Sequence, residues 1–193
     1  IYNLANAFIE EKKYDYAIQV YNKARKENPE YPYFYERAEV HKLKNDLVAM
    51  INEYLDAIEF RETELETVQM RLQNSLGYDD ETGGMNNPLL KAELQKRIQK
   101  SPDKVVFSEF LIFILKQQKE FNGAFVQSRA LDKRLKEDGR RLYELGKICV
   151  ANQDWECAKR SFDYVVEKGP LYVFYDAAVV EGLNAEYLYL TSL

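Results

Sequence analysis

One spacing pattern of small, aliphatic and aromatic residues occurs near the start of the chain and again near its end. The first copy is Leu4, Ala5, Phe8, Ala17, Tyr21, Ala24 and Pro29. The second copy keeps the same spacing throughout and is Leu145, Gly146, Cys149, Ala158, Phe162, Val165 and Pro170. Two further copies fit between them. Self-similarity at a fixed spacing is typical of proteins built from stacked repeats, so this pattern constrains the fold more than any other feature of the chain.

The residues of each copy recur at helical spacing. Ala17, Ile18, Tyr21 and Ala24 would share one face of a helix, and similar faces follow along most of the chain. Only 8 glycines and 5 prolines interrupt the 193 residues, and no run alternates between apolar and polar residues as a half-buried strand does. The sequence therefore predicts an all-α fold.

Turn signals divide the chain into helix pairs. Residues 11–13 separate the first two helices, and the prolines of residues 28–32 end the second. Residues 45–46 and 153–154 are turns, each followed by an apolar residue that opens the next helix. A glycine just past a helix end, followed by proline, predicts a helix stop at residues 168–170.

Two prolines predict helix starts. Ser101 is expected to cap a helix whose first residue is Pro102, and Asn87 to cap one that begins at Pro88. The glycine-rich residues 77–87 are expected to form a loop.

The register of the repeats is regular except in the middle. Ala24 corresponds to Ala57, and Leu131 to Val165, at nearly the same interval, which is that of one repeat. Ala57 and Leu131, in contrast, are separated by more than twice that interval. We therefore expect residues 61–100 to form a divergent helical hairpin.

This pattern resembles the tetratricopeptide repeat (TPR), a helix–turn–helix unit of about 34 residues, and the first copy matches it closely. The second copy keeps the family residues Phe34, Ala38, Tyr54 and Ala57. It departs from the family at Arg37, His41 and Met50, where Leu, Tyr and Ala are preferred. The copy at residues 105–137 retains Leu111, Leu115, Ala124 and Leu131. It places Ser128 at a position that the family fills with an aromatic residue.

The resemblance implies one TPR-like solenoid over residues 1–193, a right-handed superhelix of stacked helix–turn–helix hairpins. Its expected units are residues 1–30, 31–60, the divergent hairpin 61–100, 101–137, 138–170 and the partial unit 171–193. Because the chain opens on Ile1 within a helix, we expect it to be a fragment of a longer TPR protein. We expect the source of that protein to be bacterial.

Small residues and rings explain this spacing in physical terms. Small residues are expected where two helices approach closely, namely at Ala5, Ala38 and Gly146 in first helices and at Ala17 and Ala158 in second helices. Rings are expected to fill the space between the layers, namely Phe8, Tyr21, Tyr54 and Phe162.

The resemblance also implies that the concave face, built mainly from first helices, is a peptide-binding groove. The residues that the register places there are Tyr2, Asn6, Tyr35, Glu39, Lys42, Glu109, Phe113, Lys116, Tyr143 and Lys147. Tyr2, Tyr35 and Tyr143 occupy equivalent places in three repeats, and tyrosine is favoured at binding hot spots. With 15 tyrosines in the chain, the alternative is that these rings pack between helices.

Some TPR proteins hold a C-terminal carboxylate with Asn and Lys or Arg on consecutive first helices. Asn6 stands at one such place, but Glu39 and Leu43 stand where the matching cations would be. A carboxylate clamp is therefore not predicted.

Composition excludes several other functions. The 27 Lys and Arg against 32 Asp and Glu give a net charge of −5, without the basic stripe that nucleic-acid binding requires. The longest apolar run, residues 110–115, is far shorter than the ~20 residues of a membrane span and predicts a buried helix. No phosphate-binding glycine loop or hydrolase motif occurs, so we expect no enzyme and no cofactor.

Metal sites are not expected either. One histidine and two cysteines offer little for zinc, and the acids of residues 79–81 lack the spacing of a calcium loop. His41 is expected to pack in the core. Cys149 and Cys157 are expected to be buried thiols, with a disulfide between them left open.

Two functions remain. The first is an interaction scaffold that binds a peptide or protein on its concave face. The alternative is a structural spacer within a larger multidomain protein, with no ligand in its groove. End-to-end self-association through apolar terminal faces is a further expectation. The sequence leaves the compartment open between the cytoplasm and an exported location.

Overall fold

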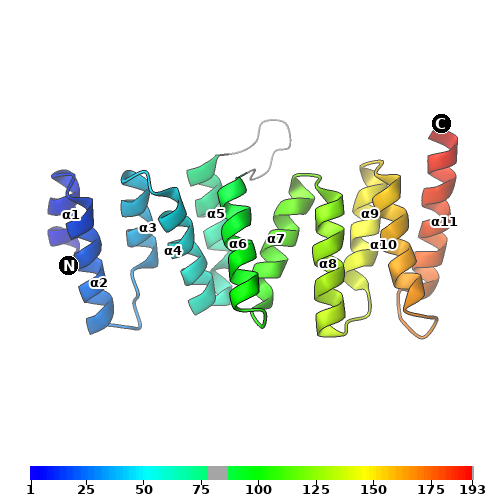
Figure 1. The fold of residues 1–193 in the computed structure, drawn as a ribbon, viewed down its shortest axis with the longest axis horizontal. Coiled ribbons are helices and arrows are strands. Elements are labelled where there is room, and N and C mark those ends of the chain that lie inside the picture. The colour runs from blue at the N-terminus through cyan, green and yellow to red at the C-terminus, as the bar shows by residue number, and fades with distance from the viewer. Residues whose placement is uncertain (78–86, 193) are drawn as a thin grey trace. The chain divides into compact units, whose positions relative to one another are not determined.

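A computed structural model of the chain describes residues 1–77 and 87–192. These residues form eleven α-helices and one short 3₁₀-helix, and no strand occurs among them (Figure 1). The predicted all-α fold of a helical repeat is therefore confirmed.

The helices follow one another with short connections. Their bounds are α1 (Tyr2–Glu10), α2 (Tyr14–Glu27), α3 (Phe34–Leu43), α4 (Leu47–Phe60), the 3₁₀-helix η1 (Glu62–Glu64), α5 (Leu65–Leu76), α6 (Pro88–Lys100), α7 (Val105–Gln117), α8 (Phe121–Leu135), α9 (Arg140–Ala151), α10 (Trp155–Glu167) and α11 (Tyr175–Ser192).

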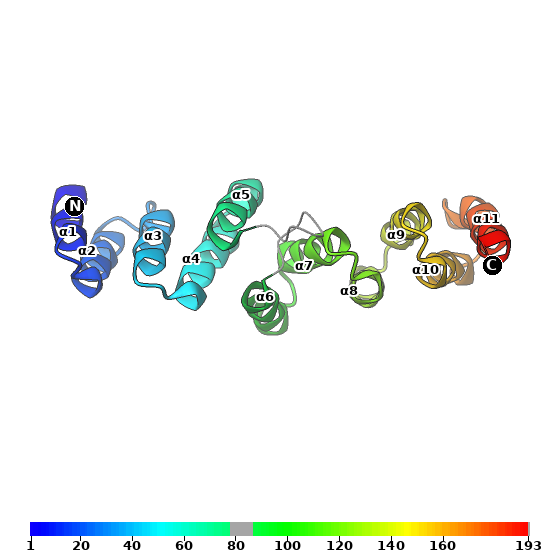
Figure 2. The same cartoon turned by 90° about the horizontal axis from the view of Figure 1, so that it is seen from above.

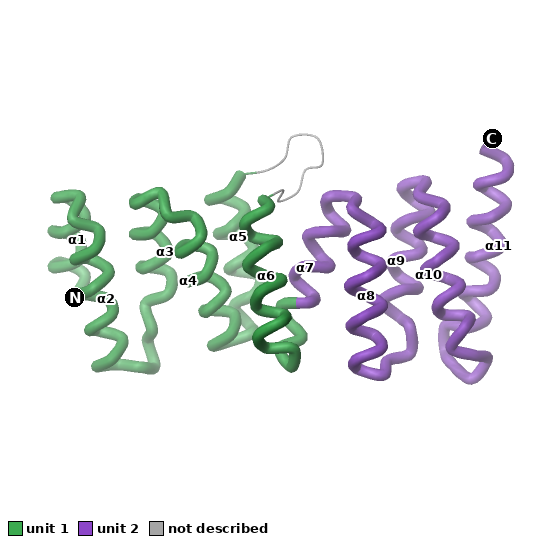
Figure 3. Tube along the Cα trace, in the orientation of Figure 1, with its two compact units in different colours: residues 1–107 green, residues 108–193 purple. Residues whose placement is uncertain are grey.

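The chain divides into two compact units, residues 1–107 and residues 108–193, with the boundary inside α7 (Figure 3). In the first unit, α1, α3 and α5 form one layer and α2, α4 and α6 the other (Figure 2). Consecutive helices from α1 to α4 pack on one another, and α4 also contacts both α5 and α6.

The second unit repeats this two-layer plan. Helices α7, α9 and α11 lie in one layer, and α8 and α10 in the other (Figure 2). α9 packs on both α8 and α10, and α10 also packs on α11. Helices of the two layers thus cover one another, which is how a stacked repeat buries its apolar face.

The turns inside four helix pairs share one backbone conformation. Lys12, Asn45, Lys119 and Gln153 all have positive φ, between 56° and 60°. Their intervals along the chain are those between the equivalent core positions 24, 57, 131 and 165, as the sequence register predicts. In each turn the following N–H donates to a carbonyl five residues back, as Asp46 N does to His41 O at 2.9 Å. A left-handed residue past a helix end is the usual way to satisfy these terminal carbonyls.

Most of the predicted helix boundaries are confirmed. α2 ends at Glu27 before the prolines, α4 and α10 begin at Leu47 and Trp155, and Gly169 follows α10 with a φ of 105°. Asn87 caps α6, because its side chain accepts hydrogen bonds from Leu89 N at 3.0 Å and Leu90 N at 3.3 Å. Of the predicted loop 77–87, residues 78–86 lie outside the described residues.

The prediction that Ser101 caps a helix beginning at Pro102 is wrong. Ser101 N donates to Arg97 O at 2.8 Å, so Ser101 closes α6. Its carbonyl accepts a hydrogen bond from Lys104 N at 3.0 Å, which closes a turn. Pro102 therefore lies in the turn between α6 and α7, and α7 begins at Val105.

The expected roles of small residues and rings are confirmed in the core. Ala5, Ala17, Ala38 and Ala158 are fully buried, and Gly146 is buried against a ring. Among the rings Tyr21, Tyr54 and Phe162 are buried, whereas Phe8 is half-buried.

The apolar run of residues 110–115 lies in α7, and all of its side chains except Phe113 are buried. Within the part of the chain that the structure describes, no helix is long and apolar enough to cross a membrane.

Candidate functional site

The ten residues predicted for a concave face all lie on the first helices of their pairs, α1, α3, α7 and α9. Tyr2 and Asn6 are on α1, and Tyr35, Glu39 and Lys42 on α3, in the first unit. Glu109, Phe113 and Lys116 are on α7, and Tyr143 and Lys147 on α9, in the second unit.

The three equivalent tyrosines make contacts within the solenoid. The hydroxyl of Tyr2 donates to Glu36 Oε1 at 2.8 Å, which joins α1 to α3. The hydroxyl of Tyr35 donates to Glu64 Oε2 at 2.6 Å, and burial together with this carboxylate raises the pKa of Tyr35. The ring of Tyr143 stacks on Phe174 with 5.2 Å between centroids. Each of the three tyrosines thus contacts another residue of the solenoid, while Tyr2 remains 47% exposed.

The remaining predicted residues of the first unit are exposed. Asn6 and Lys42 lie on the surface of α1 and α3. Glu39 is exposed too, and it accepts a hydrogen bond from Tyr54 Oη at 3.0 Å. Burial and the nearby Glu39 raise the pKa of Tyr54 to about 12.

An aromatic pocket of about 170 Å³ lies in the first unit where α4 ends and α3 begins. Its rings are Tyr31, Tyr33, Phe34, Tyr35 and Phe60. Only Tyr35 belongs to the predicted site. The density of rings in residues 31–35 is the sequence signal that marks this pocket.

A concavity rich in charged side chains lies in the second unit, between α7 and α9. We call it the α7–α9 groove; its volume is about 600 Å³. The residues that line it are Glu109, Ile112, Lys116, Ser128, Glu137, Asp138, Arg140, Arg141 and Glu144. Two of them, Glu109 and Lys116, belong to the predicted concave face. Tyr143 and Lys147 lie on α9 but do not line the groove.

Ion pairs organise the charges of the groove. The guanidinium of Arg141 pairs with Glu109 of α7 and with Glu137, which precedes α9. Its Nε lies 2.9 Å from Glu109 Oε1. Arg140 pairs with Glu144 one helical turn later, with 2.9 Å between Nε and Oε1. The groove therefore presents carboxylates and guanidinium groups side by side, an arrangement that suits a partner carrying both signs of charge.

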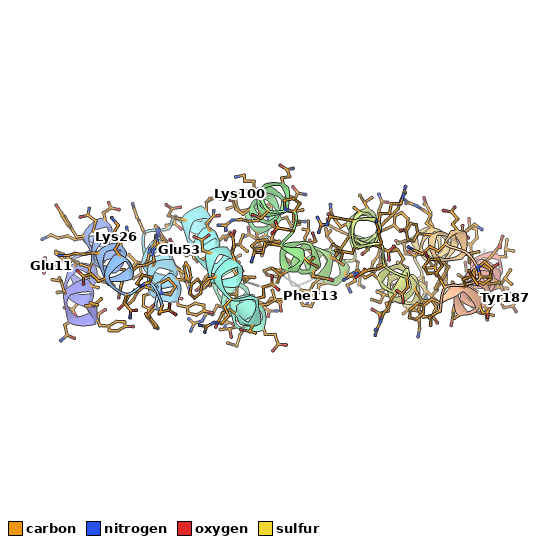
Figure 4. The ribbon with its side chains drawn as sticks, turned by 90° about the horizontal axis from the view of Figure 1, so that it is seen from below. Glu11, Lys26, Glu53, Lys100, Phe113 and Tyr187 are labelled. Atoms are coloured by element: carbon orange, nitrogen blue, oxygen red, sulfur yellow. The ribbon has the colours of Figure 1, made fainter. Side chains whose placement is uncertain are left out.

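Ile112 and Ser128 are the two uncharged residues of the lining, and both are buried. Phe113 follows Ile112 on α7 and lies at the surface of the chain, with 36% of its side chain exposed (Figure 4). Charged side chains therefore make up most of the lining of the groove.

A buried carboxylate holds one wall of the groove in place. Asp132 of α8 is fully buried. It accepts hydrogen bonds from Gly139 N at 2.9 Å and Tyr164 Oη at 2.8 Å, and pairs with Lys168 Nζ at 2.6 Å. Lys168 also donates to the carbonyl of Glu137 at 2.7 Å. The segment that carries Glu137 is thus held by side chains from α8 and from the end of α10, a function that the sequence did not reveal.

A second buried charge cluster lies between α3 and α4 in the first unit. Arg37 Nη2 is 2.6 Å from Glu53 Oε1, and His41 Nε2 is 3.9 Å from the same oxygen. Burial raises the pKa of Glu53 to about 7, although Arg37 opposes the shift. The predicted packing of His41 is observed, but its neighbour is this carboxylate. Arg37 and His41 are visible in the sequence as departures from the repeat, whereas Glu53 is not.

The two cysteines are free thiols. Cys149 of α9 and Cys157 of α10 are both buried, as predicted. Among residues 1–77 and 87–192, no group of three or more His, Cys, Asp or Glu side chains is arranged to hold a metal ion. The α7–α9 groove is the candidate functional site.

Comparison with known proteins adds no family to this description. No protein-family model matches the chain, and no curated protein has a significantly similar sequence.

Proposed function

We propose that the chain is a TPR-type scaffold that binds a polypeptide segment of another protein in the α7–α9 groove. The observation that carries the proposal is the groove itself, about 600 Å³ in volume and lined mostly by charged side chains from α7, α9 and the turn before α9. A concavity of this size accepts several residues of an extended chain.

The charges of the groove favour a segment that carries both acidic and basic residues. Lys116 offers an ammonium group at one wall, while Glu144 and Asp138 offer carboxylates at the other. Complementary charges determine the orientation of a bound segment and the rate at which it associates. The exposed ring of Phe113 adds apolar contact area on the same helix.

The test begins with a displayed library of random peptides selected on the whole chain. Enriched peptides are labelled and titrated by fluorescence anisotropy against the wild type and two variants of α7, Phe113→Ala beside the groove and Lys116→Glu in its lining. Each variant has a matched control on the exposed surface of α8, Val126→Ala and Lys133→Glu. We expect the two α7 variants to weaken binding about tenfold or more and the controls about twofold or less, because truncation of a hot-spot contact costs about 2 kcal/mol or more.

Equal losses in the α7 variants and their controls would contradict the proposal. Tyr35 and Tyr143 are unsuitable for this test, because both rings pack within the solenoid and their truncation would change stability as well.

The spacer alternative is favoured by a different observation, the bonds from Tyr2 to Glu36 and from Tyr35 to Glu64. These bonds join α1 to α3 and α3 to the 3₁₀-helix within the first unit. If no library peptide is enriched on the chain, the spacer function is the better account.

A further inference from the structure

The aromatic pocket of the first unit has no role in the proposed function. Its volume is about 170 Å³, well below the ~300–1,000 Å³ of sites for drug-sized ligands, so it admits one small group and not a peptide segment. The segment before α3, the first turn of α3 and the end of α4 form its lining. The rings and the charges of this lining determine which group fits.

Rings from two segments of the chain line the pocket. Tyr31 and Tyr33 precede α3, and their ring centroids are 4.7 Å apart in an edge-to-face arrangement. Phe34, the first residue of α3, packs edge-to-face on Phe60, the last residue of α4, with 5.9 Å between centroids. Tyr31 is 48% exposed and Phe60 51%, so a ligand can reach these rings from solvent. The faces of aromatic rings carry partial negative charge and attract cations.

The charged side chains of the lining also favour a cation. Glu30, Glu36 and Glu64 contribute three carboxylates, and Arg61 contributes a guanidinium group. Arg61 is 3.7 Å from Glu64, and 60% of its side chain is exposed. Its guanidinium carbon lies over the ring of Phe60, 5.9 Å from the centroid. The lining therefore carries an excess of negative charge, and one of its rings already has a cation near its face.

The hydrogen bonds of these carboxylates favour a cation that has no N–H groups. Glu36 Oε1 accepts from the hydroxyls of Tyr2 and Tyr31, at 2.8 Å in each case. Glu64 Oε2 accepts from the hydroxyl of Tyr35 at 2.6 Å. These oxygens are engaged, so they contribute charge rather than a new acceptor. A primary ammonium group is strongly hydrated and would lose water on entry, whereas a quaternary ammonium group has no donors to satisfy.

We propose that the aromatic pocket binds a trimethylammonium group, the head of a choline-like compound or of a trimethylated lysine side chain. Clusters of rings recognise quaternary ammonium ligands through the attraction between the cation and the ring faces. The carboxylates of the lining add the opposite charge. The pocket belongs to the first unit and the α7–α9 groove to the second, so this inference does not depend on the proposed function.

The test begins with the ligand and uses the whole chain. Choline is titrated into the isotope-labelled protein, and the backbone amide signals are followed by NMR. The matched control ligand is dimethylbutanol, the uncharged compound in which carbon replaces the nitrogen of choline. We expect choline to cause saturable shifts in residues 30–36 and 57–64, and dimethylbutanol to bind at least about fivefold more weakly, in keeping with the strength of cation–π contacts.

A third ligand distinguishes the two sources of the group. A short peptide that carries trimethyllysine is titrated in parallel with choline. Tighter binding of the peptide assigns the pocket to a modified side chain, and tighter binding of choline assigns it to a small molecule; either result supports the inference. Equal binding of choline and dimethylbutanol, or no saturable shift of the pocket residues with either cation, would overturn it.

Two variants test the ring and the charge separately. Phe60→Leu keeps an apolar side chain but removes the ring face, and Glu36→Gln removes a carboxylate; each should weaken choline binding about threefold or more. The matched controls are Tyr16→Leu and Glu11→Gln, at exposed positions outside the pocket, and they should change binding less than about twofold. Unchanged choline binding in both pocket variants, shown to be folded by circular dichroism, would overturn the inference.

Arg61→Ala should have the opposite effect. It removes the cation that lies over Phe60 and competes with the ligand, so choline should bind about twofold or more tightly. A residue that only maintained the fold would not raise the affinity when removed. Weaker binding to a folded Arg61→Ala variant would contradict a cation site in the pocket.

Discussion

A Cβ atom on Gly146 of α9 would lie 2.7 Å from Cε1 and Cζ of Phe162 on α10. The ring of Phe162 is fully buried, so it has no free space into which it could move. The two helices of this pair can approach as they do only because one of them has no side chain at the point of contact.

Substitution at Gly146 should therefore destabilise the second unit. Gly146→Ala forces a shift of Phe162 and overpacks the core, and we expect a loss of about 1–3 kcal/mol in the free energy of unfolding. Chemical denaturation monitored by circular dichroism measures it.

The matched control is Gly182→Ala, in α11. Its Cβ would be 3.5 Å from Cβ of Phe162, an ordinary contact distance, and alanine is the better helix former by about 0.8–1 kcal/mol. This variant should be more stable than the wild type. Destabilisation of equal size in both variants would contradict the account of the α9–α10 contact.

Glu53 should make the stability of the first unit depend on pH. Burial raises its pKa to about 7, above the value of an unfolded chain, so the folded state holds this proton more tightly. The stabilisation is complete below the unfolded pKa near 4.5 and is lost as the pH rises through about 7. Arg37, Arg25 and Arg97 lie near the carboxylate and limit the shift, while Asp56 adds to it.

His41 acts in the opposite sense. Burial lowers its pKa, so its contribution is lost as the pH falls below about 6.5. Comparison of the wild type with Glu53→Gln isolates the carboxylate. We expect the stability of the wild type relative to Glu53→Gln to fall by about 1–3 kcal/mol between about pH 4.5 and pH 7.5. A constant difference across this range would show that Glu53 has the same pKa in the folded and unfolded chain.

Asp132 should be one of the most sensitive positions of the second unit. Asp132→Ala removes a carboxylate that is fully buried and leaves the ammonium group of Lys168 without its partner, at an expected cost of about 3–5 kcal/mol. Tyr164→Phe removes only one of the three contacts and should cost about 1–3 kcal/mol. Urea denaturation ranks the two, and the reverse order would contradict the proposed network.

The thiols should be unreactive in the native chain. Cys149 is 0% exposed and Cys157 3%, and the hydrogen bond with Cys157 together with burial raises the pKa of the Cys149 thiol. Because the thiolate is the reactive form, a disulfide reagent such as Ellman's should modify the cysteines only as the α9–α10 pair opens. Rapid reaction of a thiol in the absence of denaturant would show that this pair is looser than its packing indicates.

The fold is predictable because its signals are local. Prolines, glycines and turn residues mark most helix boundaries, and residues such as Ala17 and Gly146 reveal the register through their small size. The prediction for Ser101 fails because the same residues suit a helix cap and a turn. The choice between them depends on the hydrogen bond from Lys104 N to Ser101 O, which sequence does not disclose.

The site is only partly predictable. The register identifies Glu109 and Lys116 but not Arg141 and Glu137, because their ion pairs depend on how the turn before α9 is held by Asp132. Ser128 is visible in the sequence as a departure from the repeat. The sequence does not show, however, that Ser128 is buried, with only 1% of it exposed.

The most direct test of the central claim is photo-crosslinking from a side chain beside the groove, on the helix that carries Glu109 and Lys116. Benzoylphenylalanine is placed at position 113 of α7 and, as the control, at position 126 of α8, both of which are exposed in the wild type. On irradiation with a peptide selected on the wild type, the account predicts a covalent adduct at position 113 and none at position 126. An adduct at position 126, with none at 113, would contradict binding in the α7–α9 groove.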